Sequence, residues 1–260
     1  MSPRLNVDRI VPTDKVGSYH VYLENAQVEF DGFRALDIDE FGVFYNELRV
    51  IIGPNGAGKT TLCDVISSRT PLTYGTVYID HTDIAHAGDV AVATMGVGRK
   101  FQTPTVFDSL TVFENMDLAL PRGKSVVPNL WHNQAKEETE SIFSVLKDVG
   151  LSQQFNTPAK FLSHGERQWL ALGMLILAEP KLLLVDEPAA GLTDKETRLT
   201  AELLLRLKGL RTMIVIEHDM EFVRMLDSLV TVMNEGKILA QGRIEELREN
   251  PEVVQAYLGR

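Results

Sequence analysis

The order of apolar and polar positions along the chain predicts an α/β protein. A strand-like pattern begins at Val21 in VYLENAQVEF, and the apolar segment LRVIIG, from Leu48, runs directly into a glycine-rich turn. We expect a helix from Lys59 after this turn, and further strands in GTVYID, KLLLVDE, RTMIVIEH and SLVTVMNEGKILAQG. Helical spacing predicts helices near 134–149, 166–178 and 195–208. Because strands and helices alternate, a mainly parallel sheet is expected.

Two regions depart from this alternation. Residues 1–20 contain two prolines and several charges without a sustained period, so they predict a loose N-terminal extension before a domain at 21–260. The region from about 103 to 162 is mostly helical in pattern, with a looser middle, PRGKSVVPNLWHN. It predicts a helical insertion within the domain.

Composition and charge narrow the class of protein. A formal net charge of -10 argues against a protein that binds duplex nucleic acid, which needs a surplus of Lys and Arg on one face. The single cysteine, Cys63, excludes a disulfide framework and fits a reducing compartment. No apolar run approaches the roughly 18 residues of a membrane span. We therefore expect a cytoplasmic protein that contacts a membrane through protein partners.

The strongest motif lies between the predicted strand at Leu48 and the predicted helix at Lys59. It matches the phosphate-loop pattern in full, with the residues Gly53, Pro54, Asn55, Gly56, Ala57, Gly58, Lys59 and Thr60. Glycines let backbone N–H groups approach phosphate oxygens, the lysine adds a positive charge near the β and γ phosphates, and the threonine hydroxyl can bind Mg²⁺. The motif predicts that the chain binds ATP with Mg²⁺.

Two further apolar strands end in groups suited to phosphate chemistry. LLLVDEP ends in Asp186, which can hold Mg²⁺ directly or through water, and Glu187, which can act as general base toward water. In MIVIEHD the apolar run ends at His218, at the strand edge where open α/β sheets bind ligands, so its imidazole can contact a γ phosphate. Lone histidines are more often structural, and His20, His81, His86 and His132 are interpreted as surface residues in loops.

From about Val21 to the C-terminus, these motifs resemble the ATP-binding subunits of ABC transporters. GPNGAGKTT, which includes Thr61, corresponds to the Walker A motif, LLLVDE to Walker B and His218 to the switch histidine. Gln102 in RKFQTP corresponds to the Q-loop glutamine, and Phe30 to an aromatic residue that stacks on adenine. The resemblance implies an ABC-type P-loop NTPase core with antiparallel N-terminal strands and an inserted α-helical subdomain. It also implies catalytic roles for Glu187, His218 and Gln102, and Mg²⁺ ligands from Thr60, Gln102 and Asp186.

The stretch FLSHGERQWL has two interpretations. Ser163 can simply cap a helix whose apolar face continues through Leu170. Alternatively, the stretch resembles the family's signature motif, usually LSGGQ, in which Ser163, His164, Gly165 and Glu166 would face ATP held by a second subunit. His164 and Glu166 depart from that pattern, as does Thr193 in AAGLTD, where many relatives have Asp. Their effect on the ATPase rate and on communication between subunits stays open.

Several segments resemble one importer group within the family. GRKFQTPTVF, Trp169 and the ending AYLGR are similar to branched-chain amino-acid and urea importer ATPases, most of all to the UrtD type of urea importers. The resemblance implies an ATPase that powers import of a small polar solute, with urea first. Branched-chain amino acids or short amides are the alternative, and a non-transport ABC ATPase, acting as a clamp or as a regulatory module, is the rival class.

Such an importer implies a set of partners. They are a sister ABC ATPase subunit in a heterodimer, two transmembrane permease subunits and an external solute-binding protein, with no nucleic acid. The chain would then lie at the inner face of the cell membrane. Phe107 and Phe113 are candidates for a groove that binds a short helix of the permease, with packing inside the helical insertion as the alternative.

Overall fold

The computed structural model describes residues 17–100, 105–121 and 131–258. The predicted Q-loop residue Gln102 therefore lies outside the described residues. The described residues form two β-sheets. The larger sheet has six strands in the order β10-β9-β3-β8-β7-β6. These strands are β3 (Leu48–Ile52), β6 (Val97–Lys100), β7 (Leu182–Asp186), β8 (Thr212–Ile216), β9 (Leu229–Asn234) and β10 (Lys237–Gly242). All neighbours pair in parallel except β9 and β10, so the prediction of a mainly parallel sheet is confirmed.

The smaller sheet is antiparallel and lies at the N-terminal side, as predicted. Its order is β2-β1-β4-β5, with β1 (Tyr19–Phe30), β2 (Phe33–Phe44), β4 (Tyr74–Ile79) and β5 (Thr82–Asp83). A two-residue turn joins β1 to β2, and both of its residues have positive φ, 48° at Asp31 and 83° at Gly32. Such a turn matches the right-handed twist of the paired strands, which favours this hairpin.

The first strand begins at Tyr19, earlier than the predicted start at Val21. This extension buries His20, whose Nδ1 lies 2.7 Å from the hydroxyl of Thr212 on the larger sheet. The interpretation of His20 as a surface residue was therefore wrong, because the side chain bridges the two sheets. His81 and His86 are exposed, whereas His132 falls within a helix rather than a loop.

Helices cover both faces of the parallel sheet. On one face, α2 (Lys59–Ile66) packs with the antiparallel sheet around Ile51, and α3 (Asp89–Thr94) lies beside them. On the other face, α6 (His164–Leu177), α7 (Asp194–Leu207) and α8 (Met220–Met225) pack around Val50 and Ile52. The alternation of side chains along β3 therefore serves two cores, which explains why its apolar run is continuous.

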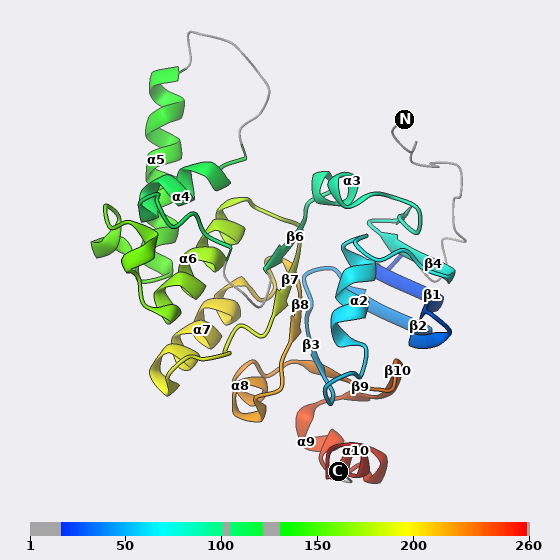
Figure 1. Ribbon diagram of the computed structural model, residues 1–260. Coiled ribbons are helices and arrows are strands. Elements are labelled where there is room, and N and C mark those ends of the chain that lie inside the picture. The colour runs from blue at the N-terminus through cyan, green and yellow to red at the C-terminus, as the bar shows by residue number, and fades with distance from the viewer. Residues whose placement is uncertain (1–16, 101–104, 122–130, 259–260) are drawn as a thin grey trace.

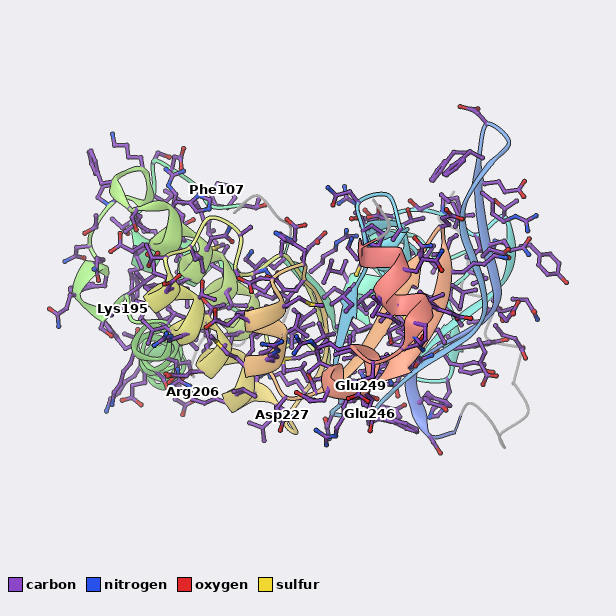
Figure 2. All side chains as sticks on the ribbon, turned by 90° about the horizontal axis from the view of Figure 1, so that it is seen from below. Phe107, Lys195, Arg206, Asp227, Glu246 and Glu249 are labelled. Carbon is purple, nitrogen blue, oxygen red and sulfur yellow. The ribbon has the colours of Figure 1, made fainter. Side chains whose placement is uncertain are left out.

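The helical region forms one side of the molecule, opposite the antiparallel strands (Figures 1 and 2). It contains α4 (Val112–Ala119), α5 (Trp131–Asp148) and two 3-10 turns, Ser152–Gln154 and Ala159–Phe161. Both α4 and α5 pack against α6, so the helical layer continues in space beyond the predicted boundary at 162. Near the C-terminus, α9 (Ile244–Leu247) and α10 (Pro251–Leu258) contact β10. Across the described ranges, no helix combines the length and apolar character of a membrane span.

Strand order decides what meets at the carboxyl edge of the larger sheet. β8 lies between β3 and β7, and all three run in parallel. The glycine-rich loop after β3, His218 after β8 and Glu187 after β7 therefore emerge at the same edge. This is the edge where parallel α/β sheets place their ligands.

Candidate functional site

The glycine-rich loop approaches other backbone segments too closely for side chains at two positions. A Cβ on Gly53 would lie 2.3 Å from the carbonyl oxygen of Met233, and one on Gly58 would lie 2.7 Å from that of Ala35. Gly58 also has φ of 94° and begins α2 as its N-cap, a conformation that glycine adopts without strain. In the same loop, Asn55 and Gly56 are exposed at the surface. These glycines shape a backbone cradle suited to phosphate.

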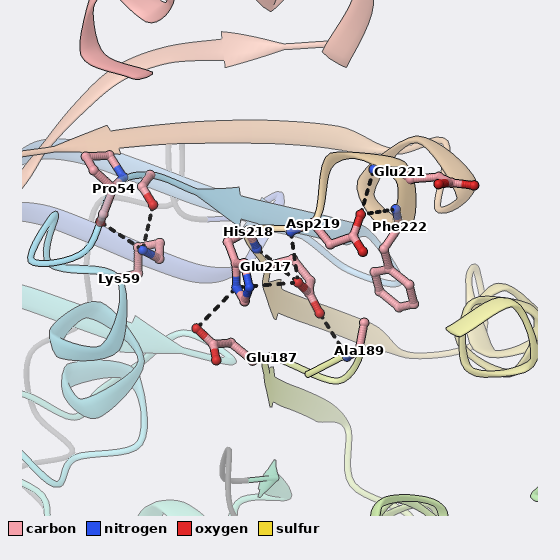
Figure 3. Close-up of polar contacts among 10 residues, drawn as sticks. Pro54, Lys59, Glu187, Ala189, Glu217, His218, Asp219, Glu221 and Phe222 are labelled. Carbon is pink, nitrogen blue, oxygen red and sulfur yellow. Dashed lines mark hydrogen bonds and ion pairs between the residues drawn. The ribbon is translucent and has the colours of Figure 1, made fainter. Parts of the chain in front are cut away.

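Lys59 places a positive charge at this cradle. Its Nζ donates hydrogen bonds to the carbonyl oxygens of Gly53, at 2.7 Å, and Pro54, at 3.0 Å (Figure 3). Burial lowers the pKa of Lys59, while the negative charges of Glu187 and Asp186 act in the opposite direction. Beside it, Thr60 is exposed in the first turn of α2 and Thr61 is half-buried. The ammonium, the N-terminus of α2 and the Thr60 hydroxyl can together bind a phosphate and its metal ion.

The turn between β9 and β10, which follows the strand paired with β3, contacts the phosphate loop. The N–H of Gly236, between β9 and β10, donates to the carbonyl oxygen of Ala57 at 3.1 Å. The carbonyl oxygen of Gly236 accepts from the N–H of Asp37 in β2 at 2.8 Å. This turn therefore joins the phosphate loop to the antiparallel sheet.

Asp186 ends β7 as a buried carboxylate among buried cations. Burial raises its pKa, and the charge of Arg99, whose Nη2 lies 3.9 Å from Oδ2, opposes that rise. Lys100 is also buried, and burial lowers its pKa to about 8 against the attraction of Asp186 and Glu217. Sequence reasoning missed both basic residues, since the charged tripeptide GRK carries no apolar signal of burial.

The chemistry of these groups fits Mg²⁺. Burial disfavours the charged form of the Asp186 carboxylate, and a nearby cation would stabilise that form. Asp186 and Thr60 can supply oxygen ligands of the kind that Mg²⁺ prefers. Within the described ranges, His, Cys, Asp and Glu form no cluster of three that could hold a metal ion by themselves. Mg²⁺ in nucleotide sites takes most of its ligands from substrate phosphates and water.

Glu187 and His218 meet across the ends of β7 and β8. His218 Nδ1 lies 3.4 Å from Glu187 Oε1 (Figure 3). The side chain of Glu187 is 21% exposed and that of His218 is 60% exposed, so both reach solvent. Glu187 has φ of 45°, which is rare for a residue with a Cβ, and its N–H donates to the carbonyl oxygen of Ile216 at 3.0 Å. Strained backbone of this kind is concentrated at functional sites.

The stretch at Ser163 begins α6 as the first interpretation predicts. Ser163 Oγ accepts from the N–H of Glu166 at 3.2 Å, and the Glu166 carboxylate accepts from the N–H of Ser163 at 2.8 Å. The other carboxylate oxygen accepts from Gln154 Nε2 at 3.1 Å. Glu166 is thereby held within its own chain by a capping box, whereas Ser163 and His164 are exposed. Because Ser163 Oγ acts as an acceptor in this bond, its proton can still be donated.

The start of α6 packs against the segment that follows Glu187. His164 Nε2 lies 3.3 Å from the carbonyl oxygen of Ala190. A Cβ on Gly165 would lie 2.2 Å from Glu196 Oε1, so a side chain there would require the Glu196 carboxylate to move. Thr193 caps α7 in a capping box with Glu196, which is the same role that an Asp could fill.

Three aromatic residues singled out in the sequence lie in different settings. Phe30 is 50% exposed at the tip of the β1–β2 hairpin, directly paired with Phe33. Phe107 is 54% exposed on the helical side (Figure 2). Phe113 is half-buried, with its ring centroid 5.9 Å from that of Phe143. Phe113 therefore contributes mainly to packing, while Phe107 can contact another molecule.

Comparison with known proteins agrees with this architecture. The family model for ABC transporters matches residues 36–190. The chain is 33% identical over 242 residues to the high-affinity branched-chain amino acid transport ATP-binding protein LivG of Escherichia coli K12, covering 89% of this chain and 94% of LivG. It is 32% identical over 241 residues to BraF of Pseudomonas aeruginosa, a protein of the same description, covering 89% and 94%.

Solved structures show the same fold. The crystal structure of a nucleotide-free ATP-binding cassette from an ABC transporter superposes with a TM-score of 0.80 at 31% identity, covering 93% of this chain and 100% of the other. The fold predicted from the sequence is thus confirmed. The chain belongs to the ABC transporter family, as an ATP-hydrolysing cassette of that family.

Proposed function

We propose that this chain is the ATPase subunit that powers an importer of branched-chain amino acids. The observation that carries the proposal is the similarity to LivG, which spans 89% of this chain and 94% of LivG. LivG and BraF are both described as branched-chain amino acid transport ATP-binding proteins. A similarity of nearly full length supports a shared role for the whole subunit.

ATP binding starts at the cradle after β3. Backbone N–H groups of the loop and of the first turn of α2 face the phosphates, and the Lys59 ammonium turns from its carbonyl partners toward the β and γ phosphates. Phe30 stacks on the adenine from the hairpin tip. Bound Mg²⁺, held by Thr60 and Asp186 with Gln102 as a predicted further ligand, would neutralise charge on the phosphate oxygens.

Hydrolysis uses the pair at the ends of β7 and β8. Glu187 accepts a proton from a water molecule whose oxygen forms a bond to the γ phosphorus, while the bond from that phosphorus to the β–γ bridging oxygen breaks. His218, 3.4 Å from Glu187, orients the carboxylate and contacts the γ phosphate. Gln102 is assigned to the same step by its motif alone.

The exposed end of α6 acts on a different nucleotide. Ser163 and the first amides of α6 face the γ phosphate of ATP held by a second ATPase subunit, assigned as a distinct sister chain. ATP then holds the two subunits together, and hydrolysis lets them separate. The motion passes to two permease subunits through the helical side, where Phe107 is exposed, and an external binding protein delivers the solute. The subunit thus works in the cytoplasm at the inner face of the membrane.

Urea was the first solute inferred from the sequence, and it is now the alternative to branched-chain amino acids. Residues 101–104 of the GRKFQTPTVF segment, which favoured urea, lie outside the described residues. Trp169 is half-buried and donates from Nε1 to Thr200 Oγ1 at 3.0 Å, so it packs between α6 and α7 and carries no information about a solute. The relatives named above favour branched-chain amino acids.

Uptake of labelled leucine and labelled urea tests the proposal. Cells that lack the gene are rescued with the parent or with Lys59→Ala, which controls for expression of an inactive chain. We expect leucine uptake to be lost and to return only with the parent. Loss of urea uptake alone would overturn the choice of solute. Unchanged uptake of both would favour an ABC ATPase outside transport.

A further inference from the structure

Glu217 is a buried carboxylate that the hydrolysis steps above do not use. It follows β8 directly, between the apolar run of that strand and His218, and its side chain is 0% exposed. Placing a carboxylate in the interior is costly unless hydrogen bonds or charges compensate it. The groups that compensate the buried Glu217 carboxylate therefore indicate its role.

The compensation comes from backbone amides on two segments. Glu217 Oε1 accepts from the N–H of Ala189 at 2.9 Å, in the segment after Glu187. Oε2 accepts from the N–H of His218 at 2.9 Å and from that of Asp219 at 3.3 Å. Burial raises the pKa of Glu217, and these amides act against that rise. One carboxylate thus ties the segment after β7 to the segment after β8 (Figure 3).

The backbone at His218 is held on its other side as well. Asp219 Oδ1 accepts from the N–H groups of Glu221 at 2.8 Å and Phe222 at 3.1 Å, capping α8. The main chain of His218 therefore lies between the buried Glu217 carboxylate and the capped helix α8, although its imidazole is 60% exposed. This fixed backbone limits where the imidazole can reach, and its Nδ1 lies 4.0 Å from Glu217 Oε2.

Hydrogen bonds also hold the backbone on both sides of the Glu187 side chain. Its N–H is bonded to the carbonyl oxygen of Ile216 on β8, and two residues later Ala189 is bonded to Glu217. Both attachments of this segment lead to the end of β8. The contact between Glu187 Oε1 and His218 Nδ1, at 3.4 Å, is thus bracketed by bonds that include Glu217.

We infer that Glu217 is a positioning residue for ATP hydrolysis, whose carboxylate sets Glu187 and His218 in register by bonding the backbone beside each of them. This inference rests on the roles proposed for Glu187 and His218. If Glu217 served only to stabilise the core, its loss would affect unfolding and leave the hydrolytic step of the folded protein unchanged.

Glu217→Gln is the sharpest perturbation, because it keeps the size of the side chain. An amide has one acceptor oxygen and a donating NH₂ group, so either Ala189 or the pair His218 and Asp219 loses its acceptor and meets a donor instead. Small displacements of reacting groups lower rates steeply, so we expect kcat for ATP to fall about tenfold or more. KM should stay within about twofold, since the phosphate loop is untouched. Glu217→Asp, which keeps the charge on a shorter side chain, should fall between the parent and Glu217→Gln.

A double-mutant cycle separates positioning from general damage. In the full-length chain, Glu217→Gln combined with His218→Ala should lose less than about twofold beyond His218→Ala alone, because the alignment of Glu187 with His218 that Glu217 maintains has no effect once the imidazole is removed. Asn115→Ala is the matched control. Asn115 is another fully buried polar side chain that binds backbone groups, those of Phe107 among them, in the helical region, and its variant should keep kcat within about twofold of the parent.

The outcomes distinguish this inference from the proposed function. If Glu187→Gln and His218→Ala lower turnover strongly while Glu217→Gln and Glu217→Asp match the parent, Glu217 is a core residue and the inference is overturned. Equal losses from Glu217→Gln with and without His218 would also overturn it. If Glu187→Gln and His218→Ala themselves hydrolyse ATP like the parent, the proposed roles fail first. Should Glu217→Gln prove unstable, Glu217→Asp carries the same comparison.

Discussion

The carboxyl ends of the parallel strands and the N-terminal end of α6 differ in how their polar groups are exposed to solvent. At the strand ends, Lys59, Asp186 and Glu217 are buried and their partners lie in the same chain. At α6, Ser163 and His164 are exposed, while the capping box satisfies the helix terminus locally. In the proposed function, hydrolysis is therefore carried out by groups of one chain, whereas α6 presents its groups to a second subunit. Changes at the strand ends should act within one chain, and changes at α6 only when two chains meet.

The largest effect is expected at Glu187. Glu187→Gln removes the proposed general base, which typically contributes roughly 10²- to 10⁴-fold, so turnover should fall by that factor with ATP binding intact. Phosphate release and nucleotide binding measure the two quantities. Glu179→Gln is the matched control, because Glu179 also has a positive φ, 51°, but is exposed and precedes β7 instead of following it. Retained hydrolysis in Glu187→Gln would remove this residue as the base.

Lys59→Ala should act on affinity. Hydrogen bonds from a charged group contribute about 1.5–3 kcal/mol, so ATP binding should weaken by roughly 10- to 100-fold. Equilibrium titration with a fluorescent ATP analogue measures this loss. Lys181→Ala removes an exposed lysine, paired with Asp80, that precedes β7 and should leave affinity unchanged. Binding equal to the parent in Lys59→Ala would contradict the phosphate-loop assignment.

Ser163→Ala tests the contrast between the two regions most directly. It should weaken ATP-dependent association about tenfold through loss of one bond to a charged phosphate, while ATP binding by the single chain stays unchanged. Thr111→Ala is its matched control, since Thr111 caps α4 in a capping box of the same kind. Both variants should lose about 1 kcal/mol of stability. Analytical ultracentrifugation in the presence of ATP measures the association of each variant. Equal association of the two variants would show that Ser163 serves only as a helix cap.

The smallest effect is expected at the hairpin tip. Phe30→Ala removes stacking worth about 1 kcal/mol, so ATP affinity should fall about fivefold with turnover at saturation unchanged. Phe33→Ala tests the assignment, because Phe33 pairs with Phe30 across the turn and is more exposed, at 68%. An equal loss in Phe33→Ala would show that the adenine is not held by Phe30 alone.

The sequence was sufficient for groups whose position follows from local pattern. Glycine spacing between a strand and a helix predicted the phosphate loop, and apolar runs that end in polar residues predicted the acidic pair and His218 at one sheet edge. Strand order, with β8 between β3 and β7, then brings them together.

The remainder depends on packing between distant segments. Glu217 was not identified from the sequence because it is adjacent to His218 and acidic residues at strand ends are usually solvated, whereas here it is buried and accepts hydrogen bonds from three backbone amides. His20 was assigned to the surface for a similar reason, since its partner, Thr212, is distant in sequence. The contact of His164 with Ala190 likewise follows from how α6 meets the end of β7.

The turn between β9 and β10 has a practical consequence for anyone who labels this protein. Surface hairpin tips normally tolerate inserted residues, and a tag or fluorophore there would look harmless from the sequence. Gly236 nevertheless bonds Ala57 of the phosphate loop and Asp37 of β2. An insertion at this tip would therefore break the hydrogen bonds that hold the phosphate loop against β2. A label at this position would impair the nucleotide site that it was meant to report on.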